Sequence, residues 1–192
     1  MSHEIDQIYS FVYRGHLTMD SLDVSLGAVD FKKDEEDYTT ILATDSLDVR
    51  FVAQARSAGQ VYVIIAAFEN SVRELISTTL KENVGEDWWE KSVSQKIKDQ
   101  AEVRIQEEEK VKWHTPKGRD PINFTMLPNL LSIIRQNQDL FLPLIHDVDW
   151  AANIFEVIER SRNVIMHSGS LSRRDAARLG TFIRDWASQV YS

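Results

Sequence analysis

VYVIIAAFENSVRELISTT, residues 61–79, is the stretch that decides the fold. Apolar residues recur in it every three or four positions, which predicts a long amphipathic helix with a broad buried face. Gly85 is expected to end or interrupt this helix. Because such a face must be covered by other elements, the stretch predicts a multi-helix fold. The residues expected on the buried face are Val61, Ile64, Ile65, Phe68, Val72, Leu75, Ile76 and Thr79.

Two further helices are expected downstream. One opens at Trp88 and Trp89, and its thin apolar stripe suits an outer helix that packs on one side only. Residues 114–124 hold two prolines and a glycine and are predicted to be a loop. A shorter helix then covers residues 127–142 and breaks near Pro143. The thin stripe consists of Val93, Ile97, Ala101 and Ile105.

The C-terminal part of the chain predicts two more helices. The first covers residues 149–168, and Gly169 is expected to take the left-handed conformation after its end. Ser172 and Asp175 have the spacing of a capping box that opens the last helix. Four or five helices joined by short loops predict an all-α, up-and-down bundle. Residues expected in its core are Trp150, Ile154, Val157, Ile158, Ser161, Ile165, Leu179, Phe182, Ile183, Trp186 and Val190.

We predict a division of the chain into an N-terminal extension, residues 1–58, packed on a helical domain, residues 59–192. Within the extension, residues 5–13 and 37–55 have helical patterns. Residues 22–31 mix residues typical of strands and turns. A length of 192 residues suits one domain with a sizeable core.

Composition predicts a cytoplasmic protein without a membrane partner. The chain has no cysteine, which excludes disulfides and thiolate metal sites and fits a reducing compartment. Its longest apolar run, Val61–Phe68, is far shorter than the roughly 20 residues that cross a bilayer. The formal net charge is −8, which argues against broad attraction to polyphosphate. Residues 159–192 reverse that balance, with six arginines against Glu159, Asp175 and Asp185.

Several kinds of site are excluded by their missing motifs. The five histidines (residues 3, 16, 114, 146 and 167) show no i, i+4 pairing, and no His-Glu-x-x-His is present. A P-loop, a Gly-x-Gly-x-x-Gly turn and a Gly-x-Ser-x-Gly elbow are also absent. Acidic residues show no clear pair on one helix for a metal nuclease. We therefore predict neither a metal ion nor a cofactor.

One segment, ERSRNVIMHSG at residues 159–169, combines groups that carry chemistry. At 100° per residue, Arg162 falls within the apolar arc, Asn163 lies about 100° further round, and His167 lies within about 40° of Asn163. The three side chains are therefore expected to share roughly one side of the last two turns. Cleavage of RNA by its own 2′-hydroxyl needs a cation on the phosphate oxygens and an imidazole that transfers protons. These three residues are therefore candidate catalytic residues. A structural role fits the same spacing: the arginine could pair with a carboxylate of another helix, and His167 could cap the last carbonyls.

Arg162-Asn-Val-Ile-Met-His167 matches the Arg-x4-His signature of the HEPN superfamily, including its polar residue after the arginine. FENSVREL at residues 68–75, the Trp88-Trp89 pair and residues 122–141 resemble the HEPN domains of Swt-type RNA endonucleases and of bacterial defence or toxin proteins. The resemblance covers roughly residues 60–190.

The resemblance implies a homodimer in which two motifs form one metal-independent endoribonuclease site, which leaves 2′,3′-cyclic phosphate ends. Arg162 would bind the scissile phosphate, and His167 would act as general acid or base. Asn163 would orient the phosphate or His167. Glu69 and Arg73 would support the site or pair helices. The setting implied is defence, toxin–antitoxin or RNA turnover, with an antitoxin or regulatory protein as a partner. Some members of the superfamily are non-catalytic dimerisation or binding modules, which is the alternative.

Overall fold

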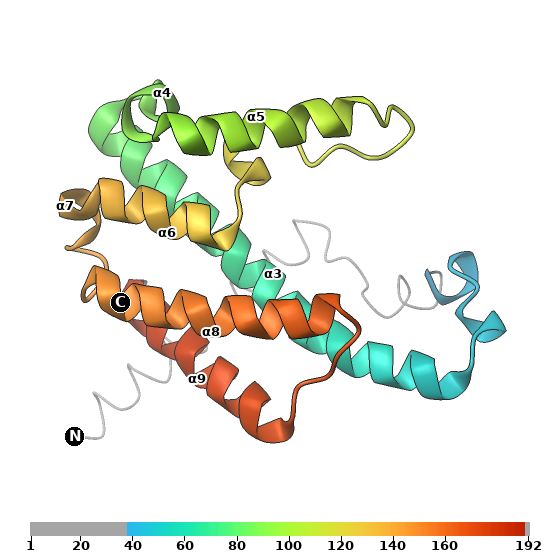
Figure 1. Cartoon of the computed structure of the whole chain (residues 1–192). Helices are drawn as coiled ribbons and strands as arrows, with labels where there is room; N and C mark the ends of the chain where they lie inside the picture. The colour runs from blue at the N-terminus through green and yellow to red at the C-terminus, as the bar shows by residue number, and fades with distance from the viewer. Residues whose placement is uncertain (1–37, 191–192) are drawn as a thin grey trace, which may run out of the picture. The chain divides into compact units, whose positions relative to one another are not determined.

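The computed structural model describes residues 38–190, and all regular structure within them is helical (Figure 1). The chain divides into two units between Val52 and Ala53, six residues before the predicted boundary. In the first unit, the described part contains a helical turn at 38–41 and the 3-10 helix η1 (Thr44–Ser46). The segments 5–13 and 22–31 lie outside the described residues.

Helix α3 (Val49–Val84) joins two patterns that the sequence suggested were separate. Residues 49–55 of the helix predicted at 37–55 are continuous with the helix predicted from residue 61, because Gly59 is accommodated inside α3, at a cost of only about 1 kcal/mol relative to alanine. The first part of that prediction is wrong, because Ala43 takes the left-handed conformation, with φ of +50°, and ends the helical turn at 38–41. Gly85, with φ of +103°, ends α3 as expected. Within the described residues, α3 is also the one helix that is long and apolar enough to cross a bilayer by length and composition. Its second half supplies core residues such as Phe68 and Val72.

The helix predicted to start at Trp88 is interrupted. Helix α4 (Trp88–Ser92) stops at Val93, which is extended, and helix α5 (Gln95–Glu109) starts after Ser94. Val93 is nonetheless buried, as the apolar stripe predicted. Side chains of the next helix satisfy the backbone at this break: Asn137 Nδ2 donates to the carbonyl of Ser92, and Ser94 N donates to Gln136. The interruption is therefore stabilised by tertiary contacts that the local pattern does not contain.

The predicted loop at 114–124 and the following helix are also subdivided. Pro121–Phe124 forms the 3-10 helix η2, and the Asp120 side chain accepts from the backbone N–H of Ile122 at its start. Helix α6 (Leu127–Gln136) and the short helix α7 (Gln138–Phe141) together cover most of the predicted 127–142. Buried Ile122 and Phe124 fix η2 to the core.

Helices α8 (Val148–Met166) and α9 (Arg173–Val190) follow the sequence expectations closely. Asp147 caps α8 by accepting from the backbone N–H of Trp150 at 2.6 Å. Ser172 accepts from the backbone N–H of Asp175 and donates to its carboxylate, so half of the predicted capping box forms. An aromatic cluster joins these helices to α3. Its rings are Phe68, Trp150, Phe155 and Trp186, in edge-to-face contacts except for the stacked pair of tryptophans.

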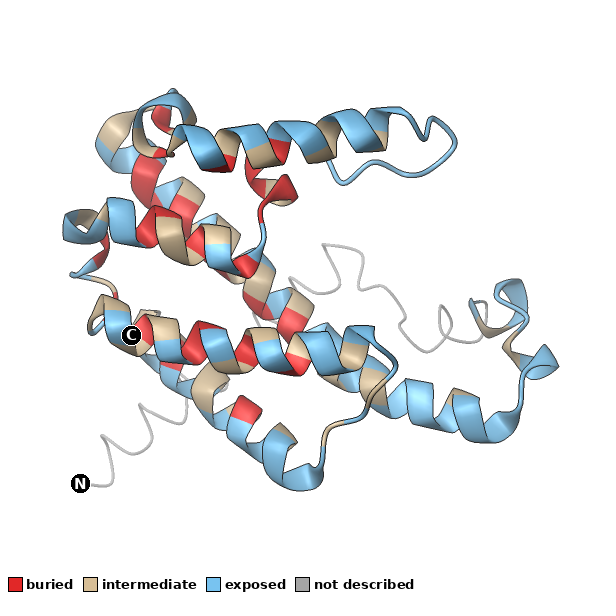
Figure 2. Cartoon of the chain, in the orientation of Figure 1, coloured by how far each residue is buried: buried red, intermediate tan, exposed pale blue. Residues whose placement is uncertain are grey.

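Within residues 53–190 the successive long helices α3, α5, α6, α8 and α9 run in alternating directions (Figure 1). Buried residues gather where α3, α6 and α8 face one another, whereas α5 is buried along one narrow side (Figure 2). The all-α prediction is confirmed. The arrangement matters for function because it places the end of α8 beside the middle of α3, where the candidate site lies.

Candidate functional site at the end of helix α8

The three candidate residues lie in the last turn of α8 and just beyond it, but they face different surroundings. The Arg162 side chain is 32% exposed and turns towards α3. Asn163 and His167 are exposed to solvent. His167 follows the last helical residue, Met166, as the C-terminal cap residue. The three residues were expected to share roughly one side of the helix, but Arg162 is half-buried against α3, whereas Asn163 and His167 are exposed.

A two-bond turn ends α8 and fixes where His167 lies. The backbone N–H of Ser168 donates to Ile165 O at 3.1 Å, and that of Gly169 donates to Val164 O at 2.8 Å. This pattern is a Schellman motif. Its left-handed residue is Ser168, with φ of +61°, so the prediction that Gly169 takes this conformation is wrong. Glycine is needed at 169 for space, because a Cβ atom there would lie 2.7 Å from Val164 O.

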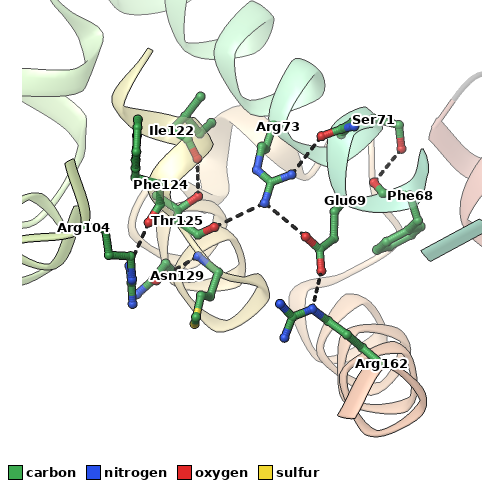
Figure 3. A network of polar contacts seen from close by, with 12 residues as sticks. Phe68, Glu69, Ser71, Arg73, Arg104, Ile122, Phe124, Thr125, Asn129 and Arg162 are labelled. Atoms are coloured by element: carbon green, nitrogen blue, oxygen red, sulfur yellow. Dashed lines mark hydrogen bonds and ion pairs between the residues drawn. The ribbon is translucent and has the colours of Figure 1, made fainter. Parts of the chain in front are cut away.

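Arg162 is paired with α3. Its Nε lies 3.2 Å from Oε1 of Glu69, and the other carboxylate oxygen of Glu69 lies 3.1 Å from a terminal nitrogen of Arg73 (Figure 3). The side chains of Glu69 and Arg73 are 14% and 15% exposed, respectively. One carboxylate therefore bridges two guanidinium groups that come from two helices. The terminal nitrogens of Arg162 point away from Glu69 in Figure 3.

The polar network continues from Arg73 to the segment before α6. The same terminal nitrogen of Arg73 donates to Thr125 O at 3.2 Å. Arg104 of α5 donates to Phe124 O at 2.7 Å. These carbonyls belong to the end of η2 and have no helical partner, so two arginines satisfy them in place of backbone donors.

A cleft of about 350 Å³ opens over this network. Its walls come from α3, α5, η2, α6 and α8, with the loop before η2 contributing Lys117. Four cationic side chains line it, against the two carboxylates of Glu69 and Glu159, which leaves an excess of two positive charges in a chain of net charge −8. An anionic group of the size of a phosphate fits such surroundings. The cationic residues are Arg73, Arg104, Lys117 and Arg162.

The cleft brings together some predicted residues and leaves others out. Arg162 lines it, and so do Glu69 and Arg73, the two residues of α3 proposed as supports. Asn163 and His167 do not line it. Arg104 and Lys117 were not identified from the sequence. Their helix and loop are distant in sequence from the motif, and only the packing of α5 against η2 brings them to the same cleft.

Comparisons of the chain with protein-family models, with curated proteins and with solved structures gave no match. The site is therefore interpreted from its own residues and geometry.

Proposed function

We propose that this protein is a metal-independent endoribonuclease of the HEPN type that acts as a homodimer in the cytoplasm. The observation that supports this most directly is how Arg162 and His167, the first and last residues of the Arg-x4-His motif, lie at the end of α8. The imidazole of His167 is exposed, and Arg162 presents its terminal nitrogens at the edge of a cleft with excess positive charge. RNA is the substrate that offers both a phosphate for the cleft and a 2′-hydroxyl nucleophile.

The proposed chemistry needs no protein nucleophile. The 2′-oxygen forms a bond to the adjacent phosphorus while the bond from phosphorus to the 5′-oxygen breaks. One imidazole takes the proton of the 2′-hydroxyl, and a protonated imidazole gives one to the departing 5′-oxygen. Arg162 stabilises the charge on the non-bridging oxygens. The products are a 2′,3′-cyclic phosphate and a 5′-hydroxyl, with atoms and charge balanced.

A homodimer would supply the second imidazole. The apolar residues that flank His167 in the last turn, Val164 and Met166, are 40% and 55% exposed. Apolar side chains beside a catalytic group are stabilised when a second subunit covers them. A partner related by a two-fold axis near these residues would bring its own His167 and Arg162 to the same phosphate.

The test is cleavage of single-stranded RNA in EDTA by the native protein and by His167→Ala, Asn163→Ala and Arg162→Ala. The matched controls are His146→Ala, an exposed histidine outside α8, and Arg160→Ala, an exposed arginine of the same helix. We expect loss of at least about 100-fold for His167→Ala, the usual contribution of acid–base catalysis. The controls should retain activity. Equal rates from His167→Ala and the native protein would reject the proposal.

A second candidate function is a non-catalytic HEPN module that dimerises or binds RNA or protein. It is favoured by the Glu69–Arg162 ion pair and by the position of His167 outside the cleft. This function predicts RNA or partner binding that survives His167→Ala, without cleavage by the native protein. Cleavage that resists EDTA and depends on His167 would eliminate it.

A further inference from the structure

The loop between α5 and η2 has a composition unlike the rest of the chain. Residues 110–119, KVKWHTPKGR, carry Lys110, Lys112, Lys117 and Arg119 and no acidic residue. All ten residues are exposed. Trp113 is 85% exposed, the most exposed large apolar side chain in the described part of the chain. An indole in water surrounded by lysines has no role in the core and is costly to leave uncovered.

The loop is anchored at its C-terminal end, and its tip is presented outward. The backbone N–H of Lys117 donates to the Glu108 side chain at 2.8 Å, which closes the loop onto the end of α5. Gly118 has φ of +118° and turns the chain toward η2. At the tip, the ring of Trp113 makes a T-shaped contact with the neighbouring ring of His114, with centroids 5.6 Å apart, and remains 85% exposed. One face of the indole is therefore available to a ligand.

Lys117 links this loop to the cleft beside Arg162. Its ammonium group lies 5.7 Å from the ring centroid of Phe124 and lines the cleft together with Arg104. Lys117 therefore belongs both to the loop and to the lining of the cleft. A ligand that contacts Lys117 lies beside the cleft that Arg162 also lines.

We propose that the 110–119 loop binds single-stranded RNA, with Trp113 stacked on an unpaired base and Lys112, Lys117 and Arg119 on the neighbouring phosphates. Indole rings stack on any base, and lysines beside them follow the phosphate backbone. Three glutamates, residues 107–109, precede the loop, so its net charge with them is only +1 and electrostatics alone gives weak binding. Stacking on Trp113 must then supply much of the affinity. The proposal rests on the proposed function for the choice of RNA, and it concerns binding rather than cleavage.

The experiment measures binding by fluorescence anisotropy of a labelled oligo(U) strand to the full chain carrying His167→Ala, in EDTA, so that no strand is cut. Trp113→Ala is expected to raise Kd roughly tenfold, since base stacking on one aromatic side chain accounts for such a factor or more. Trp113→Phe should restore part of the affinity. The matched control is Tyr62→Ala, an exposed aromatic residue of α3.

Salt dependence tests the lysines separately. Lys112→Gln should reduce the slope of log Kd against log salt by about 0.7, the value for one phosphate contact on a single strand. Lys96→Gln, an exposed lysine of α5, should leave the slope unchanged. Because neither contact uses the 2′-hydroxyl, oligo(dU) should bind with similar affinity, whereas duplex RNA, whose bases are already stacked, should bind more weakly.

Equal Kd values for Trp113→Ala and Tyr62→Ala would overturn the inference, as would equal affinity for duplex and single strand. Trp113-dependent sedimentation with anionic phospholipid vesicles, with oligonucleotide binding unaffected, would make the loop a membrane contact and would overturn it as well. Failure of the native protein to cleave RNA would instead count against the proposed function and leave the binding result intact.

Discussion

Glu69→Gln is the substitution that tests the polar network most directly. It removes one charge while it keeps the size of the side chain and one acceptor oxygen. The carboxylate is 14% exposed and has two guanidinium contacts, at 3.2 Å to Arg162 and 3.1 Å to Arg73. Hydrogen bonds to charged groups contribute about 1.5–3 kcal/mol each. Because Arg162 is 32% exposed, solvent screens part of its share, and the remaining amide oxygen retains another part.

We therefore expect Glu69→Gln to lower the free energy of unfolding by about 2 kcal/mol, or Tm by roughly 4–8 °C for a chain of this length. Urea and thermal unfolding followed by circular dichroism measure both. The control is Glu74→Gln, which makes the same charge change at an exposed position of α3. A double-mutant cycle with Arg162→Gln should give a coupling energy of about 1 kcal/mol. A loss no greater than that of Glu74→Gln, or a coupling energy of zero, would refute the reasoning.

Four further predictions concern α8 and its ends. At its C-terminal turn, Ser168→Gly should stabilise the protein by roughly 0.5–1 kcal/mol because φ is positive there. Gly169→Ala should destabilise it by more than about 1 kcal/mol because the new methyl would meet Val164 O; chemical denaturation compares the two. Asp147→Ala should lose about 1 kcal/mol through the missing N-cap, whereas Asp147→Asn should lose little, as thermal melting can show. Phe155→Ala should cost about 3–5 kcal/mol in urea unfolding through the cavity left in the aromatic cluster, and a loss below about 1 kcal/mol would contradict this packing.

Local sequence patterns predicted the helix ends and spans that nearby residues determine. The end of α3 at Gly85, the span of α8 and the N-terminus of α9 at Ser172 were each anticipated within a few residues. The break at Val93 was not, because the apolar period continues across it and the stabilising partners, Gln136 and Asn137, lie more than 40 residues away. Local pattern determines which residues are buried, while tertiary hydrogen bonds determine where a helix stops.

The candidate site, too, was predicted in part from local pattern and depends in part on tertiary packing. The helical period placed Arg162 within the apolar arc, and the ion pair with Glu69 explains how a permanent charge is tolerated there. The resemblance named Glu69 as a supporting residue, but its ion pair with Arg162, 93 positions later in the chain, depends on how α3 packs against α8. Arg104 and Lys117 were missed for the same reason. The charge count over residues 61–158 also concealed the basic 110–119 loop, because that range as a whole holds 16 acidic residues against 11 basic ones.

The arginine contacts at η2 have a consequence for the speed and strength of ligand capture. Arg73 and Arg104 hold the carbonyls of Thr125 and Phe124, and Asp120 caps the first turn, so the foot of the preceding loop is already in place before anything binds. For the ligand proposed above, this end of the loop needs no further ordering on binding, and the remaining cost lies at the tip, where each immobilised side chain costs about 0.5–1.5 kcal/mol. The C-terminal end of the loop is thus preorganised. Its backbone conformation need not change between the first encounter with a ligand and the final complex.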